Sequence, residues 1–547
     1  MNLRDLFVYE KQTKNEFLIE ESTSEQEKTY QKEEQTNENY LKKQVSSSSA
    51  QNIEYMKKIY SCPLNSDIVF REFELFFDDK AYPSFAMFID GMVDRSLISQ
   101  AIISPILSIP RFDDSVFDNS TLKDVVKKRL ILANQLSEET QFEKITEAVN
   151  IGCCVLFIDT IDTCFIADVK MWEHRTISKS ENEQTIEGPK EAFNEILRMN
   201  TALIRKTLNT QKLIIETYTV GSESKTLCAL MYISDVANES LVKEARRRIG
   251  GVRVDYLISS EELMQFIQEK TFMPMPQMIT TERPDRVARV LAEGRIAIMT
   301  HGSPSALIAP INFFELLYSS EDLYQQFLIT NMIKMVRMLG IFLSVFLPGI
   351  YITLVLYHQE MIPSFLLYTI QSAQINVPFS PVIEIIIMEI AFELIREAGI
   401  RVPGPIGPTL GIIGALILGQ ASVAANIVSP VSIVVVATTG IGSFATTNYQ
   451  LGLTLRLMRF AFIILASIGG ILAMAFGLFI YLLILVSNTS FGVPIMAPIA
   501  PKTKHIFGDS FFILPIWKYE DRDDFLNSKK KKRQPEVSRA WSGRKDK

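Results

Sequence analysis

The sequence predicts an α/β soluble N-terminal region of two subdomains, followed by an all-α polytopic membrane domain. Two observations carry this prediction. Charged residues make up 22% of the chain, yet only nine lie between Gly340 and Ser490, and none lies between Val402 and Leu455. The apolar stretches in this part are about 20 residues long, the length that a helix needs to cross a bilayer. Such a mosaic is typical of a soluble portion joined to a membrane portion.

The composition also excludes some classes of protein. The net charge of −6 is modest and argues against nucleic acid as the main partner. The five cysteines show no CxxC spacing, and Cys153 and Cys154 lie in the apolar run IGCCVLFID, so we expect buried thiols. No apolar core follows the first basic residues of MNLRDLFVYEKQTKNEF, so we expect the soluble part to stay in the cytoplasm.

The part before the membrane domain divides into a tail and two subdomains. The tail is rich in Glu, Gln, Lys, Ser and Asn, with too few apolar residues to offset the entropy of ordering. We predict a disordered polar tail at 1–52, a first cytoplasmic α/β subdomain at 53–187 and a second one at 188–320.

Alternating and helical patterns predict the elements of these subdomains in order. In the first, SDIVFREFEL alternates as a strand, and IGCCVLFID with CFIADVKMW predicts a hairpin. In the second, an apolar stripe predicts a helix over 188–208, followed by the strands KLIIETYTV and TLCALMYIS. A helix capped by Asn238 comes next, and ERPDRVARVLAEGRIAIMTHGSPSALIAP predicts helix, strand, turn and strand.

The membrane domain is predicted at 334–487, with four full spans and an amphipathic membrane helix at 381–398. Pro348 and Gly349 are expected to kink the first span. Basic residues before the first span and in a cytoplasmic basic tail at 488–547 place both ends inside, so the number of crossings is even. Four crossings fit, and six fit if the region before Val402 hides further ones. The four predicted spans are Met338–Tyr357, Ile406–Ala425, Ile427–Thr446 and Phe460–Val486.

The segment PFSPVIEIIIMEIAFELIREAG is unusual because it carries charges among apolar residues. With about 100° per residue, four of its five charged side chains share one helix face about 100° wide. An ionised group that faces lipid costs about 2.5–3.5 kcal/mol, so these groups are not expected to face hydrocarbon. The candidate pore, vestibule or subunit-contact residues are Glu384, Glu389, Glu393, Arg396 and Glu397.

Three interpretations of this charged helix stay open. It can lie in the plane of the membrane interface as a structural helix. It can face a water-filled path inside an oligomer, where its excess of carboxylates would prefer cations. Its charges can also pair with a neighbouring subunit, while Glu393 and Arg396 pair with each other at i,i+3.

Small and polar stripes in the next two spans predict close helix packing. The second span carries a small residue at every fourth position, which lets helix backbones approach each other in an oligomer. The third carries hydroxyls at Thr439, Ser443 and Thr447, which can bond across helices or line a hydrated path. The helix-packing candidates are Gly407, Gly411, Ala415 and Gly419.

The sequence lacks the motifs of common enzymes. We find no GxxxxGK[ST] or GxGxxG phosphate loop, no GxSxG and no HExxH. The four histidines are scattered along the chain, so no metal cluster is visible. We therefore predict no catalytic residues, no metal, no cofactor and no enzyme activity.

Several long blocks resemble the GerA family of spore germination proteins, specifically the A subunit of nutrient germinant receptors. The resemblance covers about residues 55–515, although His301, Ser380 and Glu187 depart from the family pattern. The blocks are FIDGMVD (88–94), ERPDRVARVLAEGRIAIMTHGSP (282–304), FLPGIYITLVLYHQEMIP (346–363), PFSPVIEIIIMEIAFELIREAGIRVPGPIG (378–407) and SFGVPIMAPIAP (490–501).

The resemblance implies a multi-pass protein of the spore inner membrane with cytoplasmic N- and C-termini. It implies a permease-like B subunit and a lipoprotein C subunit as partners, besides membrane lipid. It further implies a homo-oligomer, a pentamer, that forms a nutrient-gated channel, releases monovalent cations and triggers germination. Two alternatives stay open, which are a membrane-anchored scaffold subunit without its own pore and a secondary transporter.

Overall fold

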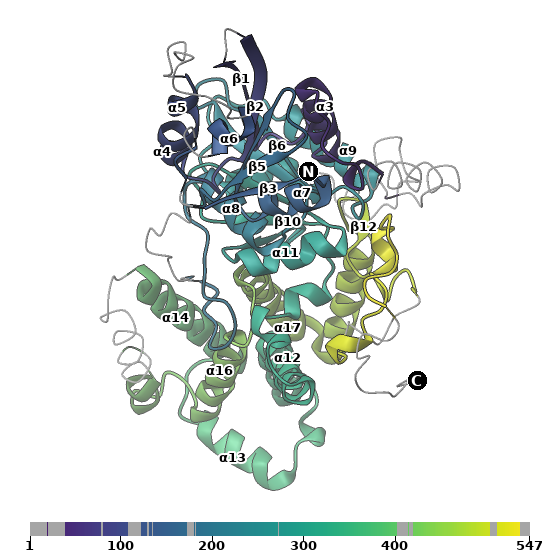
Figure 1. Cartoon of the computed structure of the whole chain (residues 1–547). Coiled ribbons are helices and arrows are strands. Elements are labelled where there is room, and N and C mark those ends of the chain that lie inside the picture. Colours follow the sequence, from purple (N-terminus) through teal and green to yellow (C-terminus); the bar gives the residue numbers. More distant parts are fainter. Residues whose placement is uncertain are drawn as a thin grey trace.

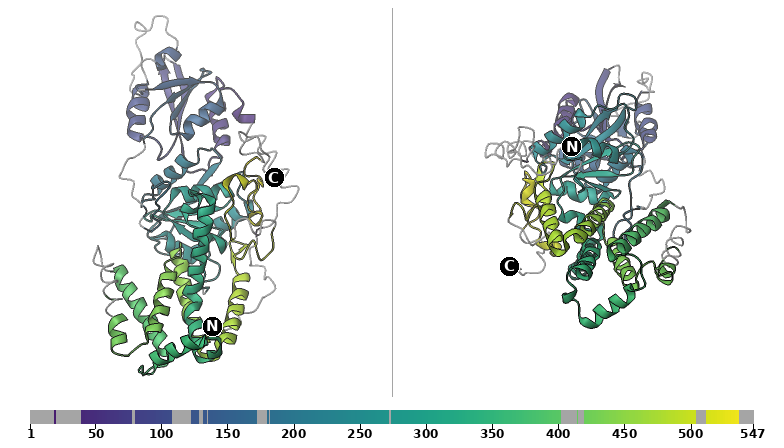
Figure 2. Two further views of the ribbon diagram at one scale, coloured as in Figure 1. Left: turned by 90° about the horizontal axis from the view of Figure 1, so that it is seen from below. Right: turned by 180° about the vertical axis from the view of Figure 1, so that it is seen from behind.

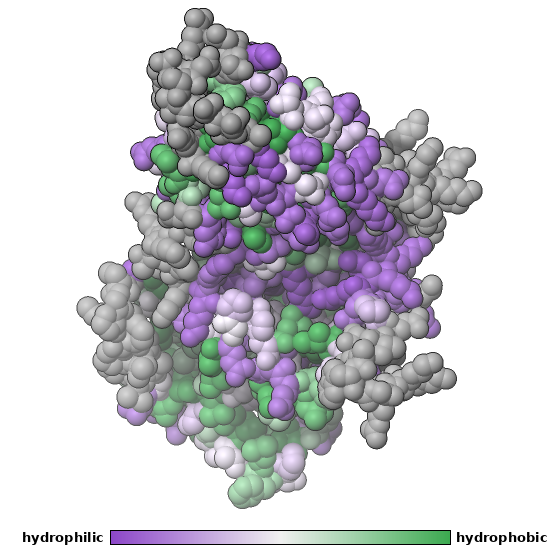
Figure 3. All heavy atoms as spheres, in the orientation of Figure 1, coloured by the Kyte–Doolittle hydropathy of each residue, from purple (hydrophilic) through white to green (hydrophobic). Residues whose placement is uncertain are grey.

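In the computed structural model, two α/β units lie at one end of the molecule, and a group of apolar helices extends from the second unit (Figures 1 and 2). Hydrophilic residues gather over the α/β units, and hydrophobic residues gather over the helices, on the face shown in Figure 3. The structure describes residues 19, 39–77, 80–107, 122–127, 131–133, 135–171, 180, 182–271, 273–401, 414, 419–503 and 511–535.

The first unit is a five-stranded antiparallel sheet with helices on both faces. Its strand order is β1-β2-β4-β5-β3, and the predicted hairpin is present, with Leu156 opposite Phe165. The strands are β1 (Ile68–Phe77), β2 (Lys80–Ile89), β3 (Leu136–Glu139), β4 (Cys154–Ile158) and β5 (Cys164–Ala167). The helices are α3 (Ser49–Ile59), α4 (Arg95–Ile98), the π-helix Ser99–Ile103, α5 (Ser104–Leu107), α6 (Leu122–Val125) and α7 (Phe142–Asn150).

The second unit repeats this topology strand for strand. Its order is β6-β7-β9-β10-β8, again antiparallel throughout, with a helix before the first strand and another between the third and fourth. The strands are β6 (Leu213–Val220), β7 (Thr226–Ile233), β8 (Ile279–Thr281), β9 (Ile296–Thr300) and β10 (Ala306–Ala309). The helices are α8 (Leu197–Thr207), α9 (Glu239–Gly251), α10 (Ser260–Ile267), α11 (Pro284–Glu293) and the 3₁₀-helices η4 (Phe314–Leu317) and η5 (Ser320–Leu323).

The predicted tail at 1–52 extends too far along the chain. Residues 39–52 pack on the first unit, and α3 begins inside the predicted tail at Ser49. Asn52 is fully buried, and its side chain bonds to both backbone groups of Ser46, at 2.9 and 2.6 Å. Polar residues that satisfy backbone groups in this way order a segment with few apolar side chains. The rest of the tail, apart from Ile19, lies outside the described residues.

The helix predicted over 188–208 is also too long, because α8 begins at Leu197. The residues before it run along the second unit, where the backbone N–H of Phe193 donates to the carbonyl of Glu282 at 2.8 Å. The side chain of Asn200 bonds to both backbone groups of Asn194 and fixes the entry into the helix. Tertiary hydrogen bonds therefore override the helical pattern.

Within its described residues, the helical part contains two helices that are long and apolar enough to cross a membrane, α12 and α17, and one shorter apolar helix, α16. The charged segment forms α14, and most of the predicted second span lies outside the described residues. The helices are α12 (Phe327–Leu356), η6 (Gln359–Met361), α13 (Ser364–Gln374), α14 (Pro381–Arg401), α16 (Pro430–Ser443) and α17 (Tyr449–Val486).

The helix α17 is broken at Gly469 and Gly470, so the predicted single span Phe460–Val486 is wrong. Gly470 has φ +58° and ψ −142°, a conformation that glycine adopts most easily. Its two arms face each other, because a Cβ added at Gly477 in the second arm would meet the side chain of Leu465 in the first. The chain therefore reverses direction here.

Both outer ends of α17 return to the second α/β unit. Gln450, at the start of the first arm, contacts Met264 of α10. Asn488, just after the second arm, contacts Met273. The turn between the arms lies at the opposite end, where the hydroxyl of Tyr357 donates to the carbonyl of Ser467 at 2.6 Å. We call the end at the α/β unit the near end of the helices and the opposite one the far end.

The predicted basic tail at 488–547 is attached to the second unit over most of its described length. It contains β11 (Thr489–Ser490), β12 (Val493–Pro494), η7 (Ile516–Lys518) and η8 (Asp524–Leu526). In the C-terminal segment, residues 511–535, Lys530 pairs with Asp235 at 2.7 Å. Burial raises the pKa of Asp235, but hydrogen bonds from Lys212 and Lys530 outweigh this effect and hold the pKa below its ordinary value. The basic run is therefore engaged by acidic groups of its own chain.

Candidate functional site

The charged helix α14 packs lengthwise against α12, α16 and the first arm of α17. Glu384 and Glu389 are fully buried by these neighbours, although the same helix leaves several apolar side chains exposed. The charged side of α14 therefore points into the helix group and its apolar side points outward. This is the inverse of a helix in a water-soluble protein, and it suits a lipid environment.

The central contact of the site is an ion pair between Glu389 and Arg459. The guanidinium Nη1 of Arg459 lies 2.6 Å from Oε2 of Glu389, and both side chains are 0% exposed. Its Nε donates to the carbonyl of Ser344 at 2.8 Å, and Nη2 donates to the Ser344 hydroxyl at 3.1 Å. One guanidinium thus joins α12, α14 and α17.

The contact with Ser344 replaces a backbone hydrogen bond that a proline removes. In an α-helix the carbonyl of residue 344 would accept from the N–H of residue 348, but Pro348 has none. Arg459 supplies the missing donor to that carbonyl. Pro348 was predicted only to kink the helix, whereas here it also opens a binding place for the arginine.

A second group of charges lies one turn nearer the α/β unit. Glu393 and Arg396 form the i,i+3 pair predicted from the sequence, and Arg456 lies 3.9 Å from Glu393. Glutamates four residues apart on α14 thus meet arginines three residues apart on α17, in opposite chain order. The two helices therefore run antiparallel and their charges match in register.

The last two carboxylates lie at the two ends of this row. Glu397 is exposed at the near end and pairs with Arg401 at 2.7 Å, so it is the predicted site residue that stays accessible. Glu384 lies toward the far end, where its Oε2 accepts from the Ser429 N–H at 2.8 Å and the Ser432 hydroxyl at 2.9 Å. Ser429 caps the N-terminus of α16, so this carboxylate also faces the positive end of a helix dipole.

The structure therefore adds an answer that the three interpretations did not include: most of the charges pair within their own chain. Sequence reasoning missed Arg456 and Arg459 as partners. The signal was available, because these are the only two charged residues between Val402 and Ser490. Their spacing complements that of Glu389 and Glu393, and a search for opposite charges in matching register would have found them.

Among the residues that the structure describes, the glycines of α12 and α16 pack closely, and most of the predicted stripe is not among them. Gly407, Gly411 and Ala415 lie outside the described residues, and a Cβ added at Gly419 would meet nothing within 4 Å. The tight approach instead joins α12 and α16, where a Cβ at Gly442 would lie 2.5 Å from the Gly340 carbonyl. The predicted hydroxyls of Thr439 and Ser443 bond to carbonyls of their own helix, and Thr447 bonds to Leu316.

Gly349 also has a packing role in addition to its predicted kink. A Cβ there would lie 2.9 Å from the methyl carbon of Met474 and 3.3 Å from the Phe462 carbonyl. These two residues belong to different arms of α17. Gly349 therefore lets α12 fit closely against both arms at their contact.

The helices and the second α/β unit are joined without a flexible linker. Arg337 of α12 pairs with Asp322 of η5 at 2.8 Å and donates to the Leu317 carbonyl at the same distance. Lys334 lies 3.9 Å from the ring centre of Tyr318. The apolar core of the unit continues into the helices as one cluster. The two parts therefore share one continuous packed contact.

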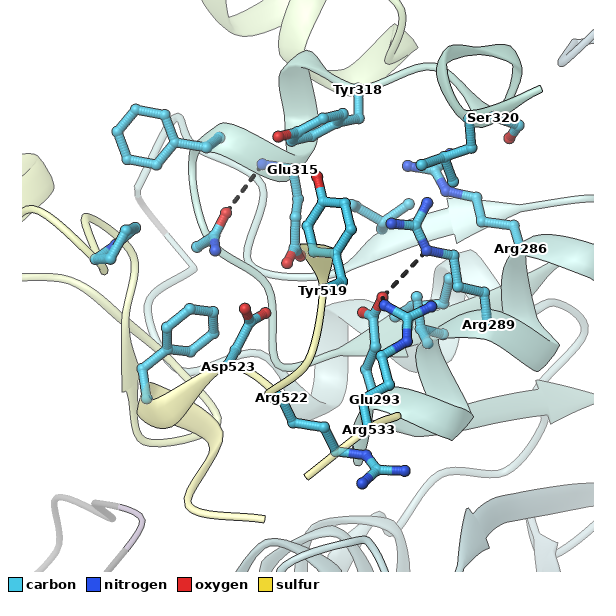
Figure 4. Close-up of a pocket in the computed structure, with 18 of the residues that line it drawn as sticks. Arg286, Arg289, Glu293, Glu315, Tyr318, Ser320, Tyr519, Arg522, Asp523 and Arg533 are labelled. Atoms are coloured by element: carbon cyan, nitrogen blue, oxygen red, sulfur yellow. Dashed lines mark hydrogen bonds and ion pairs between the residues drawn. The ribbon is translucent and has the colours of Figure 1, made fainter. Parts of the chain in front are cut away.

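A pocket in the soluble part lies between α11, the short helices η4 and η5, and the C-terminal segment (Figure 4). Its charged side chains largely neutralise each other, as in the 3.1 Å pair of Arg289 with Glu293. Burial raises the pKa of Glu293, but the charges of Arg289, Arg295 and Arg533 outweigh it and lower the pKa. The pocket walls thus serve to attach the C-terminal segment. Within the described residues, no group of three or more His, Cys, Asp or Glu could hold a metal ion.

The chain is similar in sequence to known proteins over most of its length. The family model for the Bacillus/Clostridium GerA spore germination protein matches residues 54–525. Spore germination protein KA of Bacillus subtilis is 35% identical over 90% of this chain and 89% of its own length. Spore germination protein GerLA of Bacillus cereus is 34% identical over 81% of this chain and 89% of its own.

One solved structure is also similar, the N-terminal domain of the A subunit of the Bacillus megaterium spore germinant receptor GerK3. It is 26% identical, and the match covers 49% of this chain and 97% of that one, with a TM-score of 0.37. The family match over most of the length, together with relatives above 30% identity, decides the assignment. The chain therefore belongs to the GerA family of spore germination receptor A subunits.

Proposed function

We propose that this chain is the A subunit of a nutrient-germinant receptor that sits in the spore inner membrane as a multi-pass protein. The observation that carries the proposal is the fully buried Glu389–Arg459 pair inside a group of helices with an apolar outer surface. Such a surface suits lipid, and charges placed inside it are tolerated when they are paired. The exposed apolar side chains include Leu339, Phe365, Ile441, Leu472 and Phe476.

The contacts support six crossings rather than four full spans. The helices α12, α14 and α16 and the two arms of α17 account for five, and the span predicted from the sequence at Ile406–Ala425 would be the sixth. Arg401 ends α14 at the near end, whereas Ser429 lies beside Glu384 toward the far end. An even number returns the chain to the α/β units, which supports cytoplasmic N- and C-termini.

We further propose that several copies assemble into a homo-oligomer, a pentamer, that encloses a nutrient-gated channel for monovalent cations. The charged side of α14 is largely filled within each chain, so the path is expected between chains rather than through one. Glu397, exposed at the near end, suits a cytoplasmic vestibule or a contact between subunits. The permease-like B subunit would bind the nutrient, and the lipoprotein C subunit would complete the receptor.

A flux measurement separates this channel from its alternatives. The purified chain, reconstituted alone and with its B and C partners in liposomes, is tested for release of trapped rubidium ions on addition of nutrients. A channel releases the trapped rubidium when the nutrient is added, and it carries no nutrient into the liposome. Saturable uptake of the nutrient itself would instead favour a secondary transporter. If correctly assembled receptor passes no cations while spores that carry it still germinate, the subunit is a scaffold.

A further inference from the structure

The far end of the helices holds a buried polar cluster that the charge pairs do not explain. It consists of Glu384 of α14, Tyr351 of α12, Ser429 and Ser432 at the start of α16, and Gln374 at the end of α13. The first four are at least nine-tenths buried, with Glu384 at 0% and Tyr351 at 7% exposure. Tyr351 has the other four residues around its hydroxyl.

Three atoms of this cluster are buried and make no well-formed hydrogen bond to any residue that the structure describes, although the Tyr351 hydroxyl lies near Ser429, Ser432 and Gln374. They are Oε1 of Glu384, the hydroxyl of Tyr351 and Nε2 of Gln374. A buried polar atom without a partner costs about 1–3 kcal/mol, so three at one place indicate a ligand that contacts them. A half-turn of the side-chain amide exchanges its nitrogen and its oxygen, so Gln374 can present its oxygen as well.

The charge of Glu384 indicates what that ligand is. Its Oε2 accepts two hydrogen bonds and faces the N-terminus of α16, an environment that suits a carboxylate anion. No ion pair is found for it among the described residues. Arg459, the arginine of the buried ion pair, does not neutralise Glu384 because Glu389 and Ser344 already hold it. Glu389 follows Glu384 by five positions, which is a rise of about 7.5 Å along the helix axis.

We propose that this cluster binds a small monovalent cation, sodium or potassium, between Glu384, Tyr351 and Gln374. Its oxygen atoms belong to a carboxylate, a phenol, an amide and two serine hydroxyls, with the amide of Gln374 turned so that its oxygen faces the ion. Hard cations prefer such oxygens, and a buried charge is stable when it is paired or coordinated. A single carboxylate balances one positive charge, whereas sites for divalent ions usually gather more acidic ligands.

The proposal rests on the membrane placement put forward above, but it does not require the chain to be a channel. The site lies toward the far end, about as deep as the start of α16, and joins three helices to α13. A bound cation there would hold the far ends of these helices together. It would also place one ion binding site inside each chain.

The test is equilibrium binding of radioactive sodium or rubidium to the purified full-length chain in lipid nanodiscs, with choline chloride holding the ionic strength constant. We expect saturable binding of about one ion per chain, which choline does not displace. Glu384→Gln should abolish binding, and Tyr351→Phe should weaken it several-fold because one oxygen ligand is lost. Glu360→Gln, an exposed carboxylate of η6 at the same far end, is the matched control and should bind as the unsubstituted chain does.

Absence of saturable binding to the unsubstituted chain, or equal binding by Glu384→Gln, would overturn the proposal. If Glu384→Gln does not fold, the affinity of Tyr351→Phe for rubidium decides the question, and an affinity equal to that of the unsubstituted chain overturns the proposal. If Glu384→Gln folds, an infrared band of a protonated carboxyl group that disappears in this variant but persists in saturating potassium would identify a proton site instead. Ion binding without cation release in liposomes would uphold the site and reject the channel, and the opposite result would do the reverse.

Discussion

Removal of the arginine that joins three helices tests the central contact of the molecule. Arg459→Met keeps a long apolar side chain at the position but removes all the donors. Three buried acceptors then lose their partner: Oε2 of Glu389, at 2.6 Å, and the carbonyl and hydroxyl oxygens of Ser344, at 2.8 and 3.1 Å. Breaking a fully buried ion pair from one side costs about 3–5 kcal/mol, because the remaining charge has no partner.

Further substitutions separate the contributions of Glu389 and Ser344 to this loss of stability. Adding Glu389→Met removes the unpaired charge, so the double variant should recover most of the loss and retain only about 1–3 kcal/mol for the Ser344 carbonyl. Adding Pro348→Ala should recover part of that remainder. Alanine at 348 restores the backbone N–H that this carbonyl would accept in an uninterrupted helix.

The assay is equilibrium unfolding of the full-length chain in detergent micelles, together with the germination rate of spores that carry each variant. Arg401→Met is the matched control, because its pair with Glu397 is exposed and should contribute less than about 1 kcal/mol. If Arg459→Met destabilises no more than Arg401→Met, the buried pair is not the junction inferred here. The same holds if adding Glu389→Met increases the loss.

Three further predictions concern other contacts. Gly442→Ala should destabilise the chain by about 1–3 kcal/mol in the same unfolding assay, because its Cβ would lie 2.5 Å from a backbone carbonyl. Gly419→Ala is the control and should leave stability unchanged, because a Cβ there meets nothing within 4 Å. Equal losses in the two variants would contradict the packing described. Hydrogen exchange in the C-terminal segment should rise in Lys530→Ala. In the unsubstituted chain the protection of these amides against exchange should fall only below the ordinary pKa of an aspartate, because the lowered pKa of Asp235 stabilises the folded chain above that range and this stability is lost once the carboxylate is protonated. Protection that stays constant on acidification would refute the role of the pair. Asn238→Ala should cost about 1 kcal/mol, because its side chain caps α9 through the Ser240 N–H; unchanged unfolding would show that the cap contributes nothing.

Local patterns predicted much of the fold. The strand β1, the β4–β5 hairpin, the strands β6 and β7, the Asn238 cap and the helix–strand–strand order after Glu282 all follow from residue periodicity and turn chemistry within short windows, whereas β3 and β8 were not predicted. The tail boundary and the start of α8 did not, because Val45 bonds to Thr140 and Phe193 bonds to Glu282, which are distant in sequence. The shared topology of the two units was equally hidden, since strand order depends on pairing between separate segments.

The sequence by itself determined that the chain has a charged soluble part and an apolar helical part, and that α14 carries its charges mainly on one side. Only the tertiary structure decided what those charges meet. Glu389 and Arg459 are 70 residues apart, and they meet because α17 runs antiparallel to α14 before it turns back at Gly470. A helical pattern shows which side of a helix is polar, but the partner of that side depends on how the intervening chain folds.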